Sequence, residues 1–547
     1  MKLNEQQIAD KKEFVKNYIG AANAATGSEL DANANFDCKN VNTLSGEIWK
    51  DFNAQMKRSF VSDSIRQNFD ENLADEYNRQ IEAHEIYVHD ETHTFKPYCA
   101  SVSIYPFLLS GLLSLGGESK APKHLASFCG NFVNLCFALS AQLAGAVAVS
   151  EMLLAFDYFA RKDYGNNYMD NIKTDDKLRH IIQNHLQSII YAINQPAAAR
   201  DYQSIFFNTS LFCKNYMRAI FGEFMFPDMT KPDFDSLMKL QKFYLEWFND
   251  ERTRSLLTFP VNTVAMLSDD EGVLDKDFED FVSEQMASGS AFFIYTSKSA
   301  DSLASCCRLR NELQENVFNT SIGLSGVMTG SMNVITININ RFVQDHQDNY
   351  LESLKGQVEK IHKYQFATFK YLKSLKDSKM LPLYDSGFLS MDKQFLTIGI
   401  NGVVEAAEFL GLEINYNPEY VKFLQELLKV IYDANKIGRE KYGVMFNTEY
   451  VPAENLGVKN AKWDKDGKYS SPRDCYNSYF FKAEDENISI IDKMRLHGRE
   501  VVQYLDGGSA CHLALDEYPT KESCRKLMHL AIKVGCNYFC TNIKVTC

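Results

Sequence analysis

Two adjacent cysteines, Cys306 and Cys307, stand in the part of the sequence that looks least like a structural core. The segment 301–341 continues with Arg308 and a passage rich in Gly, Ser, Thr and Asn, and it ends in a β-branched run at 333–339. Cysteine is often buried as a small apolar side chain, so a cysteine pair alone does not indicate chemistry. The polar surroundings favour a loop, and they predict thiols presented at a loop tip.

Two other segments contain residues that could do chemistry. Cys99 begins a strand-like run at 99–107, and residues 449–458 (EYVPAENLGV) place Pro452 at the expected start of a helix with Glu454 in its first turn. Proline suits the first helical position because no N–H is needed there. The exposed amides of a helix start can hold phosphate oxygens. Each signal is common by itself, so neither defines a site.

Short apolar runs alternate with long amphipathic windows along most of the chain. Strand followed by helix, repeated, predicts an α/β protein with a largely parallel sheet. No linker divides the chain, so we expect one large α/β body with a helical N-terminal portion. The strand-like runs lie at 99–107, 204–212, 291–295, 333–339 and 395–400, and the helical windows at 5–20, 44–84, 131–160, 233–249, 342–374 and 417–440.

The composition excludes several classes of function. The chain has 547 residues, a net charge of −13, 45% apolar and 24% charged residues, which is typical of a soluble globular protein with a large core. The acidic balance argues against non-specific nucleic-acid binding, although single nucleotides need only a few local amides and cations. The most apolar run, 132–149, carries Asn134 and Gln142 and is interpreted as a buried helix, not a membrane span.

The cysteines indicate the compartment. Thirteen cysteines at irregular spacing do not fit a secreted disulfide framework. The start of the chain, MKLNEQQIADKKEF, contains no apolar segment of a secretory signal. We therefore expect a reducing compartment, the cytoplasm, in which some of the thiols are functional groups.

Taken together, these segments resemble the large catalytic subunit of the anaerobic (class III, glycyl-radical) ribonucleoside-triphosphate reductases. The resemblance extends from about residue 30 to the C-terminus, and the matching motifs come in the family's order. They are DANAN (31–35), IYVHD (86–90), PYCASV (97–102), SAQLAGAVAVSEM (140–152), CCRLR (306–310), GSMNVITININR (330–341), TIGINGVVEAAEFLG (397–411), VPAENLG (451–457), CYNSYFF (475–481) and DGGSACHLAL (506–515).

The resemblance implies a fold and a reaction. The fold is a ten-stranded α/β barrel with a cysteine-bearing finger loop at its centre, formed by residues 86–547 after a helical N-terminal region at 1–85. The reaction is the reduction of a ribonucleoside triphosphate at its 2′ carbon. In this chemistry a stored glycyl radical oxidises a cysteine at the loop tip to a thiyl radical, which abstracts the 3′ hydrogen of the ribose.

The resemblance also implies a role for individual residues. Cys307 would carry the thiyl radical with Cys306 as its neighbour, and Cys99 would donate hydrogen from the opposite side of the substrate. The strand after the finger loop would contribute Ser331, Met332 and Asn333 to the active site. The substrate phosphates would bind at the helix start formed by Pro452, Ala453, Glu454 and Asn455.

Cofactors and partners follow from the same resemblance. It implies a glycyl radical, a structural zinc ion, and dNTP or ATP effectors that act at a homodimer interface through the helix expected around 140–152. A radical-SAM iron–sulfur activase would install the radical. The reductant is either formate or a thioredoxin-type dithiol protein, and the asparagine near Ser331 favours formate. No membrane or nucleic-acid partner is expected.

The sequence departs from the family at its end. Family members continue into a four-cysteine zinc site and an Arg-x-x-Gly-Tyr segment whose glycine carries the radical, whereas this sequence ends at KVTC, with Cys547 where the first zinc ligand would lie. Cys536, Cys540 and Cys547 lack paired spacing, so we expect no complete metal site. Three explanations are a cut form of a longer enzyme, a radical segment on a separate short polypeptide, and an excised element. No ATP cone is expected before residue 30.

Two alternative functions deserve comparison. One is a glycyl-radical enzyme of the pyruvate formate-lyase type, which shares the barrel and the cysteine loop. The PAEN and DGGSA segments and Cys99 favour the nucleotide enzyme. The other is a non-catalytic nucleotide-binding relic, against which the retention of Cys99, Cys306 and Cys307 argues.

Overall fold

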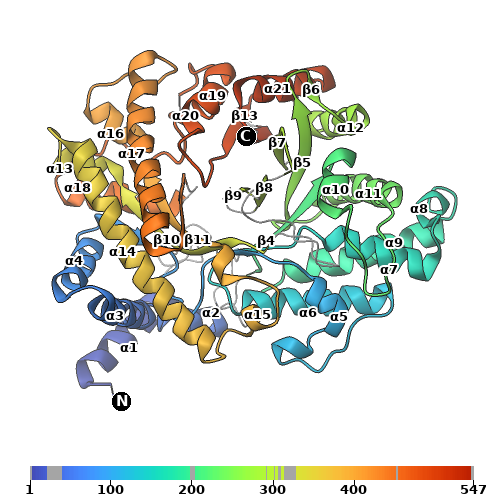
Figure 1. Ribbon diagram of the computed structural model, residues 1–547, viewed down its shortest axis with the longest axis horizontal. Helices are drawn as coiled ribbons and strands as arrows, with labels where there is room; N and C mark the ends of the chain where they lie inside the picture. Colours follow the sequence, from blue (N-terminus) through green and yellow to red (C-terminus); the bar gives the residue numbers. More distant parts are fainter. Residues whose placement is uncertain are drawn as a thin grey trace.

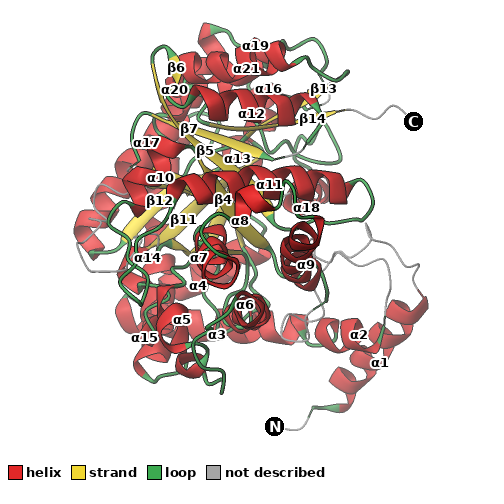
Figure 2. Ribbon diagram, turned by 90° about the vertical axis from the view of Figure 1, so that its right-hand side faces the viewer, coloured by secondary structure: helices red, strands yellow, loops and turns green. Residues whose placement is uncertain are grey.

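The computed structural model describes residues 3–20, 40–196, 204–290, 292–300, 302–305, 309–312, 328–450, 454–483 and 485–543. Helices surround a central set of strands, as Figure 1 shows, and the N-terminal helices lie at one side of the molecule (Figure 2). The α/β class and the helical N-terminal portion are therefore as the sequence predicts. Within the described ranges, no helix has both the length and the apolar character needed to cross a membrane.

The strands form two parallel halves. In the first half, β2, β3, β4, β5 and β7 pair in parallel in that order, and in the second, β10, β11 and β12 are parallel, as are β13 and β14. The halves meet where β14 pairs antiparallel with β7. The bounds of these strands are β2 Ala100–Ser101, β3 Val147–Ala148, β4 Phe207–Phe212, β5 Val261–Asp269, β7 Phe293–Ser297, β10 Gly330–Asn338, β11 Gln394–Asn401, β12 Met445–Glu449, β13 Cys511–Leu515 and β14 Tyr538–Ile543.

The second junction between the halves lies beside β2. Backbone N–H groups of Tyr98 and Cys99 donate to the carbonyl oxygens of Met332 and Ser331 at 3.0 and 2.8 Å, and Ser101 forms an antiparallel bridge with Thr329. The short strand β1 (Ile86–Val88) pairs antiparallel with the other end of β10. The antiparallel joining of two parallel halves gives the barrel that the sequence predicts.

The gap between β12 and β13 is closed by the DGG motif. The Asp506 carboxylate accepts a hydrogen bond from the backbone N–H of Thr448 at 2.7 Å, and the Gly507 N–H donates to the Thr448 carbonyl at 2.8 Å. A parallel bridge between Glu449 and Gly508 continues the pairing. Gly508 has a φ of +88°, which glycine adopts without strain. The motif therefore pairs with the backbone of β12 and closes the gap between β12 and β13.

A β-hairpin lies within the ring. It is formed by β8 (Ser302–Ser305) and β9 (Leu309–Glu312), which pair antiparallel. The backbone of β8 contacts β4, β5 and β7, and that of β9 contacts β10, so the hairpin lies between the two halves (Figure 1). This is the place expected for the finger loop.

The helices lie outside the ring of strands, and α1 and α2 stand apart from it (Figure 2). In chain order, and within the described residues, they are α1 Glu5–Gly20, α2 Val41–Glu47, α3 Lys50–Asn68, α4 Glu71–Glu82, α5 Tyr105–Ser110, α6 Leu125–Ser140, α7 Met152–Tyr164, α8 Tyr168–Asn171, α9 Asp176–Ile193, α10 Lys214–Phe221, α11 Phe234–Arg252, α12 Lys276–Ala287, α13 Ile339–Asp345, α14 Tyr350–Asp377, α15 Pro382–Asp385, α16 Val403–Phe409, α17 Pro418–Tyr442, α18 Glu454–Asp466, α19 Ile490–Leu496, α20 Arg499–Val502 and α21 Lys521–Val534.

The continuous helix expected over 131–160 is wrong. Helix α6 ends at Ser140, β3 occupies Val147–Ala148, and α7 begins at Met152, so the region 140–152 is a turn and a strand. The physical reason is that β3 fills the place between β2 and β4, and its backbone pairs with both. Valines at 147 and 149 also favour extended backbone. An effector site built on a helix at 140–152 is therefore wrong in its geometry.

Two other helical windows are divided between separate helices, and one strand-like run is shorter than expected. The window 44–84 contains α2, α3 and α4, and 342–374 is divided between α13 and α14. The run 99–107 contributes only the two residues of β2 before α5 begins at Tyr105. Periodicity alone does not mark these breaks because both sides of each break are amphipathic or buried.

Replacement of Gly507 by alanine tests the closure of the barrel. A Cβ at this position would lie 2.5 Å from the Thr448 carbonyl oxygen, so we expect Gly507→Ala to lower the free energy of unfolding by roughly 1–3 kcal/mol. Gly356→Ala is the matched control, because Gly356 lies in α14 and a Cβ there meets nothing within 4 Å. That change should raise stability by about 1 kcal/mol. Urea unfolding measures the free energy of unfolding of both variants. Equal changes in the two variants would contradict this interpretation.

A buried histidine behind β12 should make stability depend on pH. Burial lowers the pKa of His362 from 6.5 to about 4, and its Nε2 lies 2.8 Å from Oδ1 of Asn435. Between pH 6.5 and 4 the unfolded chain binds the proton more readily, so stability falls as the pH falls, by at most about 1.4 kcal/mol per pH unit from this group. His362→Gln should remove that part of the slope, and His180→Gln, on the surface of α9, should not. Urea unfolding at several pH values measures the slope of stability against pH for both variants. An unchanged slope in His362→Gln would contradict the prediction.

Candidate active site

The inward face of β12 can be read from the contacts of its neighbours. The Phe446 ring lies 4.2 Å from the ring of His362 in α14, and the Thr448 hydroxyl accepts a hydrogen bond from Asn435 in α17 at 2.8 Å. Both side chains therefore face the surrounding helices. Because side chains alternate along a strand, Asn447 and Glu449 face the interior of the barrel.

The same argument applies to β4. Phe207 packs on Phe132 of α6, outside the barrel, so Asn208 and Ser210 face inward. The Asn208 amide lies 3.4 Å from the hydroxyl of Thr263 on the neighbouring strand β5. Polar side chains thus line the interior from opposite halves of the barrel.

Several of these buried polar atoms have no hydrogen-bond partner among the described residues. They are Oδ1 of Asn208, Oγ of Ser210, and both Oδ1 and Nδ2 of Asn447; Oδ1 of Asn333, on β10, also lacks a partner. All four side chains are at most 3% exposed. An unsatisfied buried polar group costs about 1–3 kcal/mol, so native proteins rarely retain one without a use. The inward-facing amides fit a ligand that offers several hydroxyl groups.

Cys99 lies in the wall of the barrel, directly before β2. Its side chain is 1% exposed, and its Sγ accepts a hydrogen bond from the backbone N–H of Ala146 at 3.1 Å. Gly145 makes room for the sulfur, since a Cβ at that position would lie 2.5 Å from Sγ. The thiol is therefore held in one place by backbone.

Two of the three residues expected on the active-site strand lie against this cysteine. Ser331 accepts the Cys99 N–H through its carbonyl, and its hydroxyl lies 2.7 Å from that of Thr397 on β11. Met332 is buried, and its carbonyl accepts the N–H of Tyr98. A β-bulge between Ser331 and Asn333 changes the register with β11 there. The structure thus brings Cys99, Ser331 and Met332 together.

The helix start expected near Pro452 is present. Helix α18 begins at Glu454, and Asn455 in its first turn is half-buried. The helix packs closely on the segment around Tyr476, whose N–H donates to the Gly457 carbonyl at 3.1 Å. A Cβ on Gly457 would lie 2.6 Å from the Tyr476 carbonyl oxygen. Pro452 and Ala453 lie outside the described residues.

Other expected site residues also lie outside the described residues. Cys306 and Cys307 belong to the segment 306–308 that connects β8 to β9 in the sequence, and Cys547 belongs to 544–547. Among the residues that the structure does describe, no group of three or more His, Cys, Asp or Glu side chains is arranged to hold a metal ion.

His89, in the IYVHD motif, is a neutral group beside β10. It is buried, and its Nε2 lies 2.8 Å from the hydroxyl of Thr336 on β10. Burial, with a further contribution from Lys459, lowers its pKa to about 3. The imidazole is therefore uncharged near neutral pH, and it acts as a hydrogen-bonding group, not as an acid.

The inward-facing amides were not predicted from the sequence, although a signal exists. The Asn-Thr dipeptide follows an apolar residue in three strands, at Asn208, Asn262 and Asn447. Asparagine is depleted in strands, so its recurrence in buried strands is informative. The Tyr244 hydroxyl of α11 donates to Asn262, which therefore faces outward. The dipeptide thus indicates which segments are barrel strands, but it does not show whether the asparagine side chain faces the interior or the surrounding helices.

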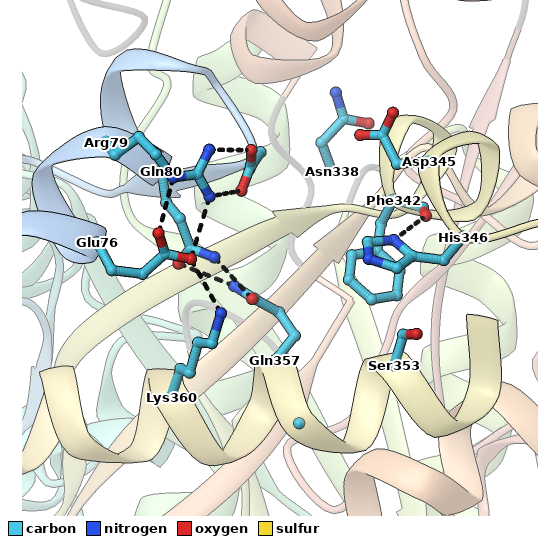
Figure 3. Close-up of a pocket in the computed structure, with 12 residues that line it drawn as sticks. Glu76, Arg79, Gln80, Asn338, Phe342, Asp345, His346, Ser353, Gln357 and Lys360 are labelled. Atoms are coloured by element: carbon cyan, nitrogen blue, oxygen red, sulfur yellow. Dashed lines mark hydrogen bonds and ion pairs between the residues drawn. The ribbon is translucent and has the colours of Figure 1, made fainter. Parts of the chain in front are cut away.

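A pocket of about 470 Å³ lies outside the barrel, between α4, α13 and α14 (Figure 3). Its charged groups pair with one another: Arg79 contacts Glu76 and Glu85 at 2.7 and 2.6 Å, and Lys360 contacts Glu76 at 2.9 Å. Hydrogen bonds from Arg79 and Lys360 lower the pKa of Glu76 to about 2. These charges neutralise one another, so the barrel interior is the better candidate for the active site.

Chemically, the interior combines three features. A buried thiol lies in one wall, unsatisfied amides face the enclosed space, and the start of a helix lies beyond the end of β12. A thiol has a weak S–H bond that suits hydrogen-atom transfer. Amides can hold hydroxyl groups, and a helix start can hold phosphate. A closed barrel also keeps water from reactive groups.

Comparison with solved structures gives relatives over nearly the whole chain. An anaerobic ribonucleotide reductase is 28% identical with a TM-score of 0.85, covering 98% of this chain and 84% of that one. The anaerobic ribonucleotide reductase from Thermotoga maritima in complex with dATP and CTP is 25% identical with a TM-score of 0.83, covering 99% of this chain and 92% of that one. The same enzyme with citrate in the active site is 27% identical with a TM-score of 0.82, covering 98% and 93%.

A search of curated protein sequences gave no match. The family model described as anaerobic ribonucleoside-triphosphate reductase matches residues 48–547. That match covers most of the chain, and it agrees with the structural relatives. The chain therefore belongs to the anaerobic ribonucleoside-triphosphate reductase family of oxidoreductases.

Proposed function

We propose that this chain reduces ribonucleoside triphosphates inside its barrel, with a thiyl radical on Cys307 and with Cys99 as a hydrogen donor. The observation that carries the proposal is the position of Cys99. Its backbone is paired with Ser331 of β10, and the hairpin of β8 and β9 enters the same barrel. A substrate bound in the interior would lie between the wall thiol and the loop that contains Cys306 and Cys307 in the sequence.

In the proposed mechanism, each group has a stated task. The Cys307 thiyl takes the 3′ hydrogen atom of the ribose, forming the thiol and leaving a carbon radical. The 2′ hydroxyl takes up a proton and leaves as water, and Cys99 supplies a hydrogen atom to the sugar. Formate, oxidised to CO₂, restores the Cys99 thiol and supplies the second electron to the sugar. The Cys307 thiol then returns a hydrogen atom to the 3′ carbon, which regenerates the thiyl radical. The inward amides of Asn208 and Asn447 would hold ribose hydroxyls. A glycyl radical would supply the chemistry that converts the Cys307 thiol to a thiyl radical by removal of its hydrogen atom.

The substrate phosphates would bind at the first turn of α18. The amides at the start of this helix, around Glu454 and Asn455, are the expected donors, since a helix N-terminus carries partial positive charge. Pro452 and Ala453 precede it in the sequence. A bound complex of the Thermotoga maritima relative contains dATP and CTP, which supports nucleotides as ligands of this chain too.

The remaining features are proposed from the family. We propose a helical region at 1–85 followed by the catalytic barrel at 86–547, a homodimer that responds to dNTP or ATP effectors, and activation by a radical-SAM iron–sulfur protein. A structural zinc ion accompanies the glycyl radical in this family. We propose formate as the reductant, supported by Asn333 beside Ser331. The expected location is the cytoplasm.

Substitution of Asn447 tests whether the interior is the binding site. Asn447→Leu removes both amide atoms that lack partners and adds an apolar group, so we expect the affinity for a ribonucleoside triphosphate to fall at least about tenfold. Asn249→Leu is the control, since Asn249 lies in α11 and its amide donates to Gln285 at 2.9 Å. Calorimetric titration of the intact chain measures both. Unchanged binding by Asn447→Leu would place the nucleotide elsewhere.

Substitution of the cysteines tests the mechanism in the activated complex. Cys307→Ser should abolish deoxyribonucleotide formation and the release of the 3′ hydrogen isotope to solvent. Cys99→Ser should abolish product formation but allow 3′ hydrogen abstraction, because Cys99 acts after that step. Cys524→Ser, in α21, should retain turnover. Turnover by Cys307→Ser would contradict the assignment of the radical.

A further inference from the structure

One buried carboxylate connects two separate segments, 338–341 and the stretch around Tyr476, to the last part of α18. Asp464 is 0% exposed and accepts hydrogen bonds from Asn338 at 2.9 Å, Asn340 at 3.0 Å, Arg341 at 2.8 Å and the Tyr476 hydroxyl at 2.7 Å. The donors come from the end of β10, from α13 and from the segment after α18. Four donors of this kind satisfy both oxygens of the carboxylate.

The guanidinium of Arg341 extends this network. Besides Asp464, it donates to the carbonyl oxygen of Trp463 in α18 at 2.9 Å and to that of Ala83 at the end of α4. Burial and the neighbouring Asp464 raise the pKa of Tyr476, which keeps its hydroxyl a neutral donor. The carboxylate therefore holds α18 against both the barrel and the N-terminal helices.

The first half of α18 is fixed by different contacts. The Asn460 amide donates to Oδ1 of Asn401 at the end of β11, at 2.8 Å, and Gly457 packs on the backbone of Tyr476. Ten residues separate Glu454 from Asp464, which corresponds to about 15 Å of helix. Contacts near both ends of such a length determine the direction of the helix axis, and hence where the first turn points.

The location of this charge is unfavourable for the helix alone. A carboxylate in the last turn opposes the helix dipole, and burial of an ion pair often costs as much as its attraction returns. An apolar residue could pack the same interface. The network is better explained as a means of positioning α18. A carboxylate with four directed donors fixes the position and the axis direction of the helix more narrowly than apolar packing does.

We propose that Asp464 is a positioning residue for substrate phosphates. It acts through α18, by holding the helix so that its first turn meets the phosphate groups, and it touches no reacting atom itself. This inference rests on the proposed function, in which the start of α18 binds those phosphates. If Asp464 has this role, loss of its carboxylate should lower the affinity for a ribonucleoside triphosphate more than the affinity for the ribonucleoside without phosphates.

The test compares ligands with and without phosphates. Asp464→Asn places an NH₂ group where one oxygen accepts from donors, so the network cannot be satisfied in its present form. We expect affinity for a ribonucleoside triphosphate to fall at least about tenfold, as misplacement by about 1 Å can do, while affinity for the ribonucleoside without phosphates changes less than about twofold. Calorimetric titration, with competition for the weaker ligand, measures both on the intact chain.

A matched control separates positioning from loss of stability. Asp157 in α7 is 2% exposed and accepts hydrogen bonds from Ser236, Tyr168 and Arg161 at 2.5, 2.9 and 2.8 Å. Asp157→Asn therefore removes a similarly buried charge that has three hydrogen-bond donors and lies far along the chain from α18. It should lower stability without changing the ratio of the two affinities.

The outcomes are distinct. If the wild-type chain binds no ribonucleoside triphosphate, the proposed function fails. If it binds, and Asp464→Asn leaves the ratio unchanged or weakens both ligands equally, the positioning role is overturned. Should Asp464→Asn fail to fold, Tyr476→Phe removes one donor and keeps the charge. That variant should shift the ratio in the same direction by a smaller factor, and an unchanged ratio would overturn the inference.

Discussion

The arrangement of the barrel depends on one antiparallel junction of backbone. Hydrogen bonds from Tyr98 and Cys99 to Met332 and Ser331 join two halves whose strands are otherwise parallel within each half. Parallel strands need crossover connections, and these place the helices outside. The junction therefore decides which side chains of both halves meet in the enclosed space, and it sets a cysteine of the first half beside the strand that follows the finger hairpin.

Unsatisfied polar atoms occur on both sides of the barrel wall. Outside, both carboxylate oxygens of Asp464 accept hydrogen bonds, whereas Nη2 of Arg161 and Nδ2 of Asn262 have no partner among the described residues. Inside, Asn447 has no such partner for either of its amide atoms. A side chain that leaves both of its polar atoms unsatisfied is the one that stability alone explains least, so Asn447 is the strongest candidate for a ligand contact.

Much of the architecture was predictable because strand and helix patterns alternate clearly. The runs at 204–212, 333–339 and 395–400 correspond to β4, β10 and β11, and α17 was found within two residues at each end. The strands β5, β12, β13 and β14 were not predicted, since their polar residues obscure the pattern. The helix expected over 140–152 failed because GAVAV fits a buried strand or a buried helix equally well, and only its neighbours in the sheet decide. The pairing of Cys99 with Ser331 joins residues more than 200 positions apart, so local sequence cannot predict it. The inward orientation of the Asn447 side chain follows from the packing of β12 on α14 and α17, which local sequence also does not show.

The glycines on either side of Cys99 have a consequence for the residues that this wall can accept. A Cβ on Gly145 would lie 2.5 Å from its sulfur, and one on Gly330 would lie 2.2 Å from its carbonyl oxygen. Backbone thus approaches the cysteine from both halves of the barrel, at distances that leave no room for a side chain at either glycine. A larger residue at position 145 would push the sulfur out of its place, so the position of the thiol is encoded by these two glycines as much as by the cysteine itself.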